Sequence, residues 1–132
     1  MPALPFSDKV RSMLERPNPA VITTLRPDGQ PVSVATWYDL DGDRVFVNMD
    51  ITRRRVEHLR NDPRVSLAVL NADSWYQQVT ILGRVVDMGD DEGLAGIDRL
   101  SQRYNGRPYP KRTSPRVNAW IEVTSWSGWG VK

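Results

Sequence analysis

The 132-residue sequence contains no cysteine and a single histidine, His58. Without cysteine the chain can form neither disulfides nor thiolate-based sites. One histidine argues against a histidine-based zinc site and against a Ser-His-Asp triad. No apolar run is long enough to span a bilayer, and the N-terminus lacks the basic-then-apolar pattern of a signal peptide. We therefore expect a cytoplasmic protein that does not bind a membrane.

Several signatures of nucleotide and metal chemistry are also missing. The chain has neither a Gly-Lys-Ser/Thr P-loop nor a Gly-x-Gly-x-x-Gly motif, and no pair of acidic residues stands out as a hydrolytic dyad. The formal net charge of +2 is too small to indicate nucleic-acid binding. One acidic cluster could bind a divalent cation, but it lacks the pattern of a calcium loop and helix capping explains it more simply: Asp87, Asp90, Asp91 and Glu92. We predict no metal site.

The sequence does contain a series of β-strand patterns. β-branched and alternating apolar residues predict six strands, at residues 20–25, 32–40, 44–49, 64–70, 75–88 and 116–124. Residues 26–30 and 41–42 carry the residue types of hairpin turns. Gly83 interrupts the fifth strand, where a glycine often marks a bulge or a close backbone approach.

Three short helices are predicted between these strands. They cover residues 8–14, residues 52–62 up to Pro63, and a segment that follows Asp90 and Asp91 and ends at Asn105-Gly106. A hydrophobic content of 39% and a charged content of 26% fit one globular domain over residues 1–132. Strands linked by hairpins, with short helices, predict a mainly β fold: a closed antiparallel barrel with its helices outside.

The second helix begins with an unusual cluster of positive charge. Thr52, the predicted N-cap, is followed by Arg53, Arg54 and Arg55 in the first turn. The helix dipole disfavours cations at this position, so helix stability alone does not account for the arginines. Exposed amides, a hydroxyl and guanidinium groups together suit a phosphate, and the alternative is a plain solvated surface. His58, in the same helix, is more typical of a surface or hydrogen-bonded residue than of a catalyst.

Five tryptophans are many for this length: Trp37, Trp75, Trp120, Trp126 and Trp129. Tryptophan has a large apolar area and one hydrogen-bond donor, which suits cores, ring-binding pockets and interfaces. Trp120 is predicted to lie in the core, and Trp129, between two glycines, to anchor the C-terminus. For Trp37 with Tyr38, and for Trp75 with Tyr76, ring-lining, dimer-interface and core roles all remain open.

Residues 53–67 resemble the phosphate-binding segment of the pyridoxamine 5′-phosphate oxidase-like superfamily, whose members are flavin-binding split barrels. The surrounding order is similar as well, from Gly29-Gln30-Pro31 through the 41–42 hairpin to Gly83-Arg84-Val85. The details are most similar to actinobacterial coenzyme F420-dependent reductases: Thr52 before the arginines, residues 104–110, and the ending at Trp129-Gly130. The resemblance implies a six-stranded antiparallel split β-barrel with short flanking helices.

The resemblance also implies a homodimer with its cofactor in a groove between the subunits. Arg55, at a position that is often lysine in the family, and Arg53 would contact the cofactor phosphate, with Thr52 adding a hydroxyl and Arg54 included in the set. Two further segments are implied, one bordering the isoalloxazine-type ring and one helping to line the groove: Val34, Ala35, Thr36, Trp37 and Tyr38, and Trp75, Tyr76, Gln77 and Gln78.

Two departures from the family pattern argue against a vitamin B6 enzyme. Residues 32–37 lack the basic residues that flank the flavin-binding strand, and residues 126–130 replace the C-terminal basic motif that holds pyridoxal phosphate. What the resemblance implies is an F420H2-dependent reductase, which would transfer a hydride to an electron-poor small molecule of enone, quinone or tetrapyrrole type. The alternatives are an FMN-dependent enzyme of the same fold and a non-catalytic F420- or flavin-binding protein. No residue is assigned as an acid-base catalyst, and the proline-rich residues 107–115 could cover the groove.

Overall fold

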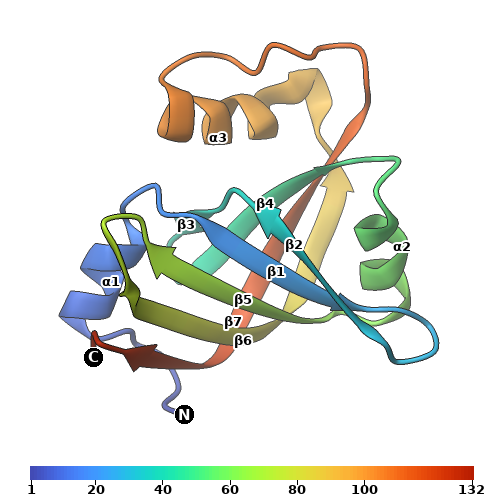
Figure 1. Cartoon of the computed structure of the whole chain (residues 1–132). Helices are drawn as coiled ribbons and strands as arrows, with labels where there is room; N and C mark the ends of the chain where they lie inside the picture. The colour runs from blue at the N-terminus through green and yellow to red at the C-terminus, as the bar shows by residue number, and fades with distance from the viewer.

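In a computed structural model, which describes every residue from Met1 to Lys132, the chain forms one antiparallel sheet and three α-helices (Figure 1). In chain order the elements are α1 (Asp8–Leu14), β1 (Ala20–Leu25), β2 (Pro31–Thr36), β3 (Asp39–Asp41), β4 (Arg44–Asp50), α2 (Arg54–Asn61), β5 (Arg64–Asn71), β6 (Ser74–Asp90), the 3₁₀-helix η1 (Glu92–Leu94), α3 (Ala95–Asn105) and β7 (Arg116–Trp129).

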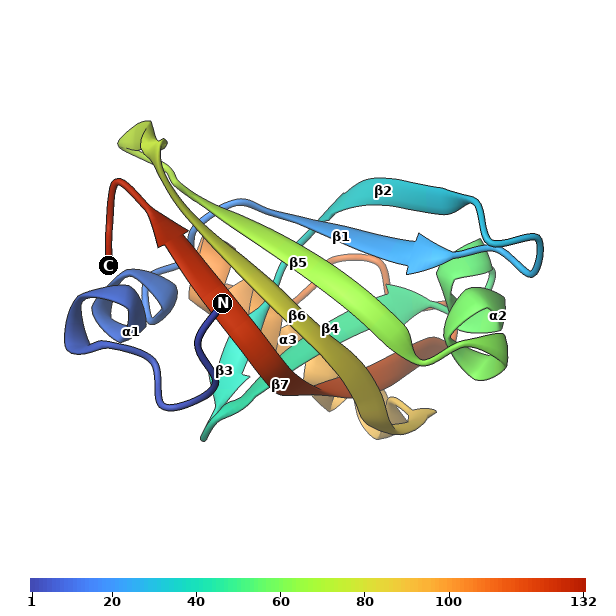
Figure 2. The same cartoon turned by 90° about the horizontal axis from the view of Figure 1, so that it is seen from below.

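The sheet curls into a barrel that stays open along one side. Its strand order is β2-β1-β5-β6-β7-β4-β3, so β2 and β3 are edges that do not pair with each other (Figure 2). The closed barrel expected from the strand pattern is therefore wrong in this respect. The split barrel implied by the family resemblance is confirmed.

The predicted strand at residues 32–40 is in fact two strands, which raises the strand count from six to seven. It breaks at Trp37 and Tyr38, where the chain leaves one edge of the open barrel and reaches the other. Tyr38 turns into the core, and its hydroxyl donates hydrogen bonds to the carbonyls of Leu14 and Arg16, at 2.8 and 3.2 Å. Alternation along the sequence could not reveal this break, because both halves have strand-like patterns.

One hydrophobic cluster fills the barrel. In β5, Val65, Leu67 and Val69 point inward in alternation, as the period of a strand requires. In β4, by contrast, every residue from Val45 to Met49 is buried, because α3 covers the outer face of that strand (Figure 1). Arg99 of α3 lies over the Phe46 ring at 4.9 Å. One face of β4 thus packs in the barrel core, and the other packs against α3.

The ends of α3 agree with the prediction. The carboxylate of Asp91 accepts hydrogen bonds from the amides of Gly96 and Ile97, at 2.7 and 3.0 Å, and so caps the first turn. Gly106 ends the helix with a φ of 71°, a conformation that glycine adopts without strain. The 11 residues of α3 make it the longest helix, and none of the helices has the length and apolar character needed to cross a membrane.

Two of the predictions for tryptophan are wrong. Trp129 is 62% exposed and does not anchor the C-terminus. Trp126 is the buried residue near that end, and its indole N–H donates to the carbonyls of Ala3 and Pro5. Trp120 is only half-buried, because its indole N–H reaches Asp41 at 2.9 Å while the ring packs on Phe46.

The glycine in β6 behaves as predicted. The pairing of β6 with β7 shifts register between Leu82 and Gly83, which marks a bulge. A side chain at residue 83 would collide with the carbonyl group of Glu122 on β7. Gly83 is therefore required by the close approach of two backbones.

Candidate functional site

Two hollows meet on the open side of the barrel. The first, which we call the arginine groove, has a volume of about 1030 Å³ and is lined mainly by β2 and the start of α2, including Arg26, Val34, Ala35, Thr52, Arg53, Arg54, Arg55 and His58. The second, the aromatic pocket, has a volume of about 490 Å³ and includes Ala35, Thr36, Trp37, Asn48, Arg55, Leu100, Tyr104, Tyr109 and Arg116. Ala35 and Arg55 line both hollows, so the two form one continuous site.

The three consecutive arginines have no acidic partner. None of Arg53, Arg54 and Arg55 forms an ion pair. The Nε atom of Arg55 is buried and has no hydrogen-bond partner. Burial, and then the positive charges of Arg53 and Arg116, lower the pKa of Arg55. A buried donor without a partner costs about 1–3 kcal/mol, and no acidic side chain of the chain offsets the charge of this turn.

The prediction that Thr52 caps α2 is wrong. The N-cap is Arg53, which makes no side-chain capping bond. Instead, the hydroxyl and the amide of Thr52 both donate to Oδ1 of Asp50, at 2.7 and 2.9 Å. Hydrogen bonds from Ser114 and from Thr52 lower the pKa of Asp50 to about 2. The turn before α2 is thus held by Asp50, and the hydroxyl proton of Thr52 is engaged within the chain.

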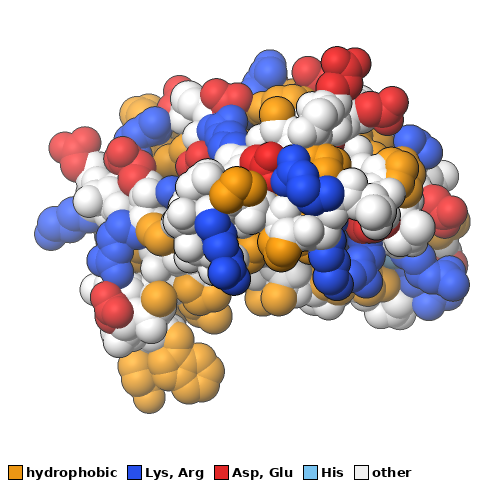
Figure 3. Space-filling view, turned by 90° about the horizontal axis from the view of Figure 1, so that it is seen from above, with side chains coloured by type: hydrophobic (Ala, Val, Ile, Leu, Met, Phe, Trp, Pro, Cys, Tyr) orange, Lys and Arg blue, Asp and Glu red, His pale blue; other side chains and the backbone are white.

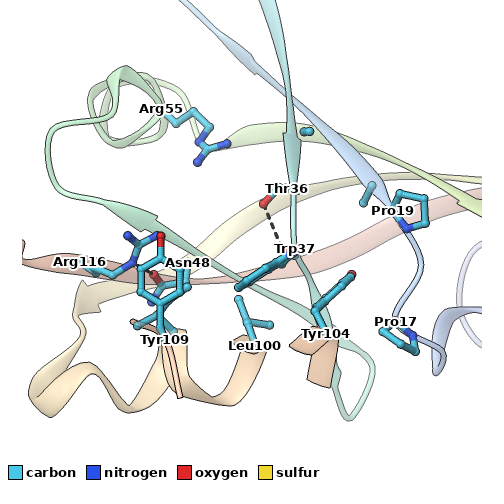
Figure 4. A pocket seen from close by; sticks show the side chains of 13 residues that line it. Pro17, Pro19, Thr36, Trp37, Asn48, Arg55, Leu100, Tyr104, Tyr109 and Arg116 are labelled. Atoms are coloured by element: carbon cyan, nitrogen blue, oxygen red, sulfur yellow. Dashed lines mark hydrogen bonds between the residues drawn. The ribbon is translucent and has the colours of Figure 1, made fainter. Parts of the chain in front are cut away.

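Strand β2 leads from the arginine groove to the aromatic pocket. Val34 lines the groove, while Thr36 and Trp37 line the pocket, and the Thr36 hydroxyl donates to the Trp37 carbonyl at 2.9 Å (Figure 4). The Trp37 ring is stacked on Tyr104 with 5.2 Å between centroids and an interplanar angle of 10°. Its other neighbour, Tyr109, meets it edge-on at 6.1 Å. The pocket therefore has flat aromatic walls that suit a planar ring.

The Tyr38 side chain does not reach either hollow, because it is buried in the core. Burial, more than any neighbouring charge, raises the pKa of Tyr38 and that of Tyr104. The Tyr104 hydroxyl donates to the Asn18 carbonyl at 2.6 Å. Both phenols are therefore neutral and hydrogen-bonded within the chain.

The structure does not bring Trp75, Tyr76 and Gln78 to this site: they lie near the β5–β6 hairpin and line neither hollow. Trp75 and Tyr76 are 71% and 69% exposed, and Tyr76 lies against Trp129 with 6.3 Å between ring centroids. A group of hydrophobic side chains projects from one corner of the molecule in Figure 3. Aromatic rings in such a position leave a large apolar area in water.

Sequence reasoning missed the residues that α3 and β7 contribute. Arg116 donates from Nε to Oδ1 of Asn48 at 2.7 Å, and its guanidinium lies over the Tyr109 ring at 5.0 Å. Asn48 in turn donates to Asp91 at 3.0 Å. These two hydrogen bonds of Asn48 join residues more than 40 positions apart, so local patterns could not show them. The one local feature in the sequence that pointed to these residues was Tyr109, an aromatic residue between two prolines in the loop expected to cover the groove.

His58 is the hydrogen-bonded residue that the sequence favoured. It is buried between α2 and β1, and its Nδ1 lies 2.9 Å from the Thr24 hydroxyl. No cluster of three or more His, Asp or Glu side chains in the structure could hold a metal ion.

An open barrel of this topology, with a cationic groove beside an aromatic pocket, defines a split barrel of the flavin- and deazaflavin-binding type. The chain belongs to the family described as pyridoxamine 5′-phosphate oxidase, which residues 6–130 match. A solved F420 reductase is 28% identical and superposes with a TM-score of 0.82 over 94% of this chain and 98% of that one. General Stress Protein 26 from Bacillus anthracis has the same fold, at 16% identity and a TM-score of 0.70 over 95% and 94% of the two chains. So does protein Rv2991 from Mycobacterium tuberculosis, at 21% identity and a TM-score of 0.71 over 96% and 86%.

Proposed function

We propose that the protein is an F420H2-dependent reductase that transfers a hydride to an electron-poor small molecule. The observation that carries this proposal is Arg55, whose buried Nε lacks a partner at the junction of a cationic groove and an aromatic pocket. A cofactor with a planar ring at one end and an anionic tail that includes a phosphate fits this arrangement. The solved F420 reductase, similar over nearly its whole length, supports the choice of cofactor.

The roles of the residues follow from their positions. Arg53, Arg54 and Arg55 would hold the phosphate, since guanidinium groups donate several hydrogen bonds in one plane. The segment from Val34 to Trp37, at the end of β2, would border the ring, with Tyr38 holding that segment to the core. Thr52 would bind phosphate only if its hydroxyl released Asp50. When bound, the cofactor supplies the hydride, while the protein orients it and shapes the acceptor pocket.

The amount of positive charge favours F420 over FMN. The arginine groove contains four arginines, of which only Arg26 has an acidic partner, Asp28 at 3.0 Å. FMN carries a single terminal phosphate. F420 carries a phosphate and, beyond it, carboxylates, so it offers a longer run of negative charge along such a groove. FMN remains the second candidate because the family match is to a flavin-binding fold.

We also propose a homodimer in which each subunit completes the groove of the other. Apart from Met1, the exposed large hydrophobic residues all lie on β6 and at the end of β7: Trp75, Tyr76, Leu82, Val86 and Trp129. Trp75, Tyr76 and Trp129 lie next to one another, and exposed apolar groups gathered in this way are typical of an interface. Trp75, Tyr76 and Gln78, which line neither hollow of their own chain, would then reach the groove of a second copy.

Titration of tryptophan fluorescence with F420 and with FMN tests the cofactor directly. We expect quenching at micromolar F420, partly through Trp37, and much weaker quenching by FMN. Anaerobic mixing of the F420H2 complex with cyclohex-2-en-1-one, menadione and biliverdin should then oxidise the cofactor with at least one acceptor. Tight FMN binding without a response to F420 would reverse the choice of cofactor. Binding of F420 without oxidation by any acceptor would favour a binding protein.

A further inference from the structure

The aromatic pocket contains one phenol whose hydroxyl has no hydrogen-bond partner. Tyr109 lines the pocket and is half-buried, yet its hydroxyl makes no hydrogen bond within the chain. The hydroxyl of Tyr104, the other phenol of this pocket, is instead engaged by Asn18. A phenol can donate one hydrogen bond and accept others, so the Tyr109 hydroxyl is free to serve a bound molecule.

The backbone of Tyr109 is held in place from both sides. Asp98 of α3 accepts the Tyr109 amide at 2.9 Å, and Nη1 of Arg112 donates to the Tyr109 carbonyl at 3.0 Å. Arg112 and Asp98 also form two parallel hydrogen bonds with each other, at 2.9 and 3.0 Å. We call this arrangement the Asp98–Arg112 clasp. Because Asp98 and Arg112 lie toward solvent, the pair adds little stability by itself, and its clearest effect is to fix the loop that carries Tyr109.

Two positively charged side chains, Arg55 and Arg116, line the same pocket as Tyr109. The Arg116 guanidinium covers one face of the ring at 5.0 Å, and Arg55 enters the same pocket from α2. Figure 4 shows Tyr109 and Arg116 together on one side of Trp37, with Arg55 directed into the space above them. A molecule that develops negative charge on an oxygen beside Tyr109 would be stabilised by this field.

We propose that Tyr109 donates a proton to the carbonyl oxygen of the acceptor, and that the acceptor is therefore a conjugated carbonyl compound. The inference rests on the proposed function, which supplies the hydride. Addition of a hydride to the β-carbon moves the π electrons of the C=C bond toward the carbonyl, whose oxygen becomes an enolate. The O–H bond of Tyr109 breaks and its proton joins that oxygen, which gives an enol that tautomerises in water. The tyrosinate takes a proton back from solvent, and the proton left on the oxidised cofactor is released to solvent.

Asp98 and Arg112 are positioning residues in this scheme, since neither lines the aromatic pocket. Loss of the clasp would free the loop at residues 107–115 and let the Tyr109 hydroxyl move away from the acceptor. Their effect should therefore pass through Tyr109 alone.

Tyr109→Phe tests the assignment, because it removes one oxygen that has no partner in the chain and should leave the thermal midpoint unchanged. With cyclohex-2-en-1-one as the probe, we expect kcat to fall about 100-fold, the usual contribution of a positioned acid. The solvent deuterium isotope effect on turnover should change as well. In a readout independent of turnover, the complex with oxidised F420 should bind the enone about threefold to tenfold more weakly, as judged by tryptophan fluorescence. Lys111→Ala is the matched control, an exposed residue of the same loop without an ion pair, and it should retain the wild-type kcat.

Two results separate this inference from the function beneath it. If Tyr109→Phe binds F420 as wild type does and keeps its kcat, isotope effect and enone affinity within twofold, Tyr109 is not the donor and the reductase proposal stands. If the wild-type protein does not bind F420, both proposals fall. For the clasp, Asp98→Ala should lower kcat about tenfold in the wild type and have no further effect in Tyr109→Phe. Equal losses in the two backgrounds would overturn the positioning role.

Discussion

Arg55 and Arg116 reach the same pocket from α2 and β7, and neither has a strong acidic partner there. Arg116 lies 4.0 Å from Asp50, at the limit of an ion pair, and Arg55 has no ion pair at all. Burial of Arg55, together with its proximity to Arg53 and Arg116, disfavours its charged form and lowers its pKa. An anion bound between these groups would relieve the repulsion between their positive charges.

Arg55→Ala should therefore weaken cofactor binding without harming the fold. Loss of hydrogen bonds to a charged group costs about 1.5–3 kcal/mol, which corresponds to about a 10- to 150-fold rise in the Kd for F420. The thermal midpoint of the free protein should stay level or rise, because an unpartnered buried donor disappears. Fluorescence titration and thermal melts measure the two effects. Arg60→Ala, an exposed residue of the same helix, is the control. A change in Kd within twofold would demote the arginine turn to surface charge.

Acid should destabilise the turn before α2 through Asp50. Its pKa in the folded protein, about 2, lies below the unfolded value of about 3.9. Ionised Asp50 therefore contributes stability that is fully present above about pH 4 and is lost as the pH falls toward 2. Urea unfolding at intervals between pH 2 and 5 should show a smaller decline for Asp50→Asn than for the wild type. Parallel curves for the two proteins would count against this role of Asp50.

Asp91→Ala should be among the most destabilising single changes in the chain. The Asp91 carboxylate is buried and bonds to Asn48 and to the first turn of α3. Its removal deletes a helix cap and leaves buried donors unpaired, which together cost about 2–4 kcal/mol in the free energy of unfolding. Urea unfolding measures this loss. The neighbouring Asp90 is exposed and makes no ion pair, so Asp90→Ala should change stability by less than about 0.5 kcal/mol.

The proposed dimer predicts complementation between two defective proteins. Arg55→Ala removes the phosphate contact of its own groove, and the double change Trp75→Ala, Tyr76→Ala removes the contribution to the groove of a second copy. Each protein alone should bind F420 poorly. After mixing and subunit exchange, a heterodimer would contain one intact groove, so one high-affinity site should reappear per heterodimer. Sedimentation of the double variant reports whether the dimer itself persists. A monomeric wild type would rule out the scheme.

Local patterns in the sequence predicted the parts of this fold that depend on neighbouring residues. Alternation in β5, the glycine bulge in β6 and the stop at Gly106 all depend on residues close together in the chain, and all were predicted. The arginine turn was visible for the same reason, since its three side chains are consecutive. Thr52 was misassigned as a cap because Asp50, two positions earlier, competes for its hydroxyl.

The remaining errors concern contacts between distant segments. Tyr38 was predicted to lie in a strand that borders the cofactor ring, but its side chain is buried in the core, where its hydroxyl contacts the Leu14 carbonyl. Asn48 and Arg116 had no local signature as a pair, because the pairing of β4 with β7 brings them together. Trp75 and Tyr76 lie away from the site of their own chain, so their expected role depends on a second molecule that no single sequence displays.

The walls of the aromatic pocket belong to two separable parts of the molecule. Trp37 is supplied by the barrel, whereas Leu100, Tyr104 and Tyr109 come from the segment between β6 and β7 that lies outside it. Mutations in that segment can reshape this side of the pocket while β2 and the arginine turn remain intact. The same barrel could thus acquire new substrates through changes in the segment between β6 and β7 alone. In laboratory evolution of this chain for a new substrate, we expect the mutations to concentrate between residues 95 and 115.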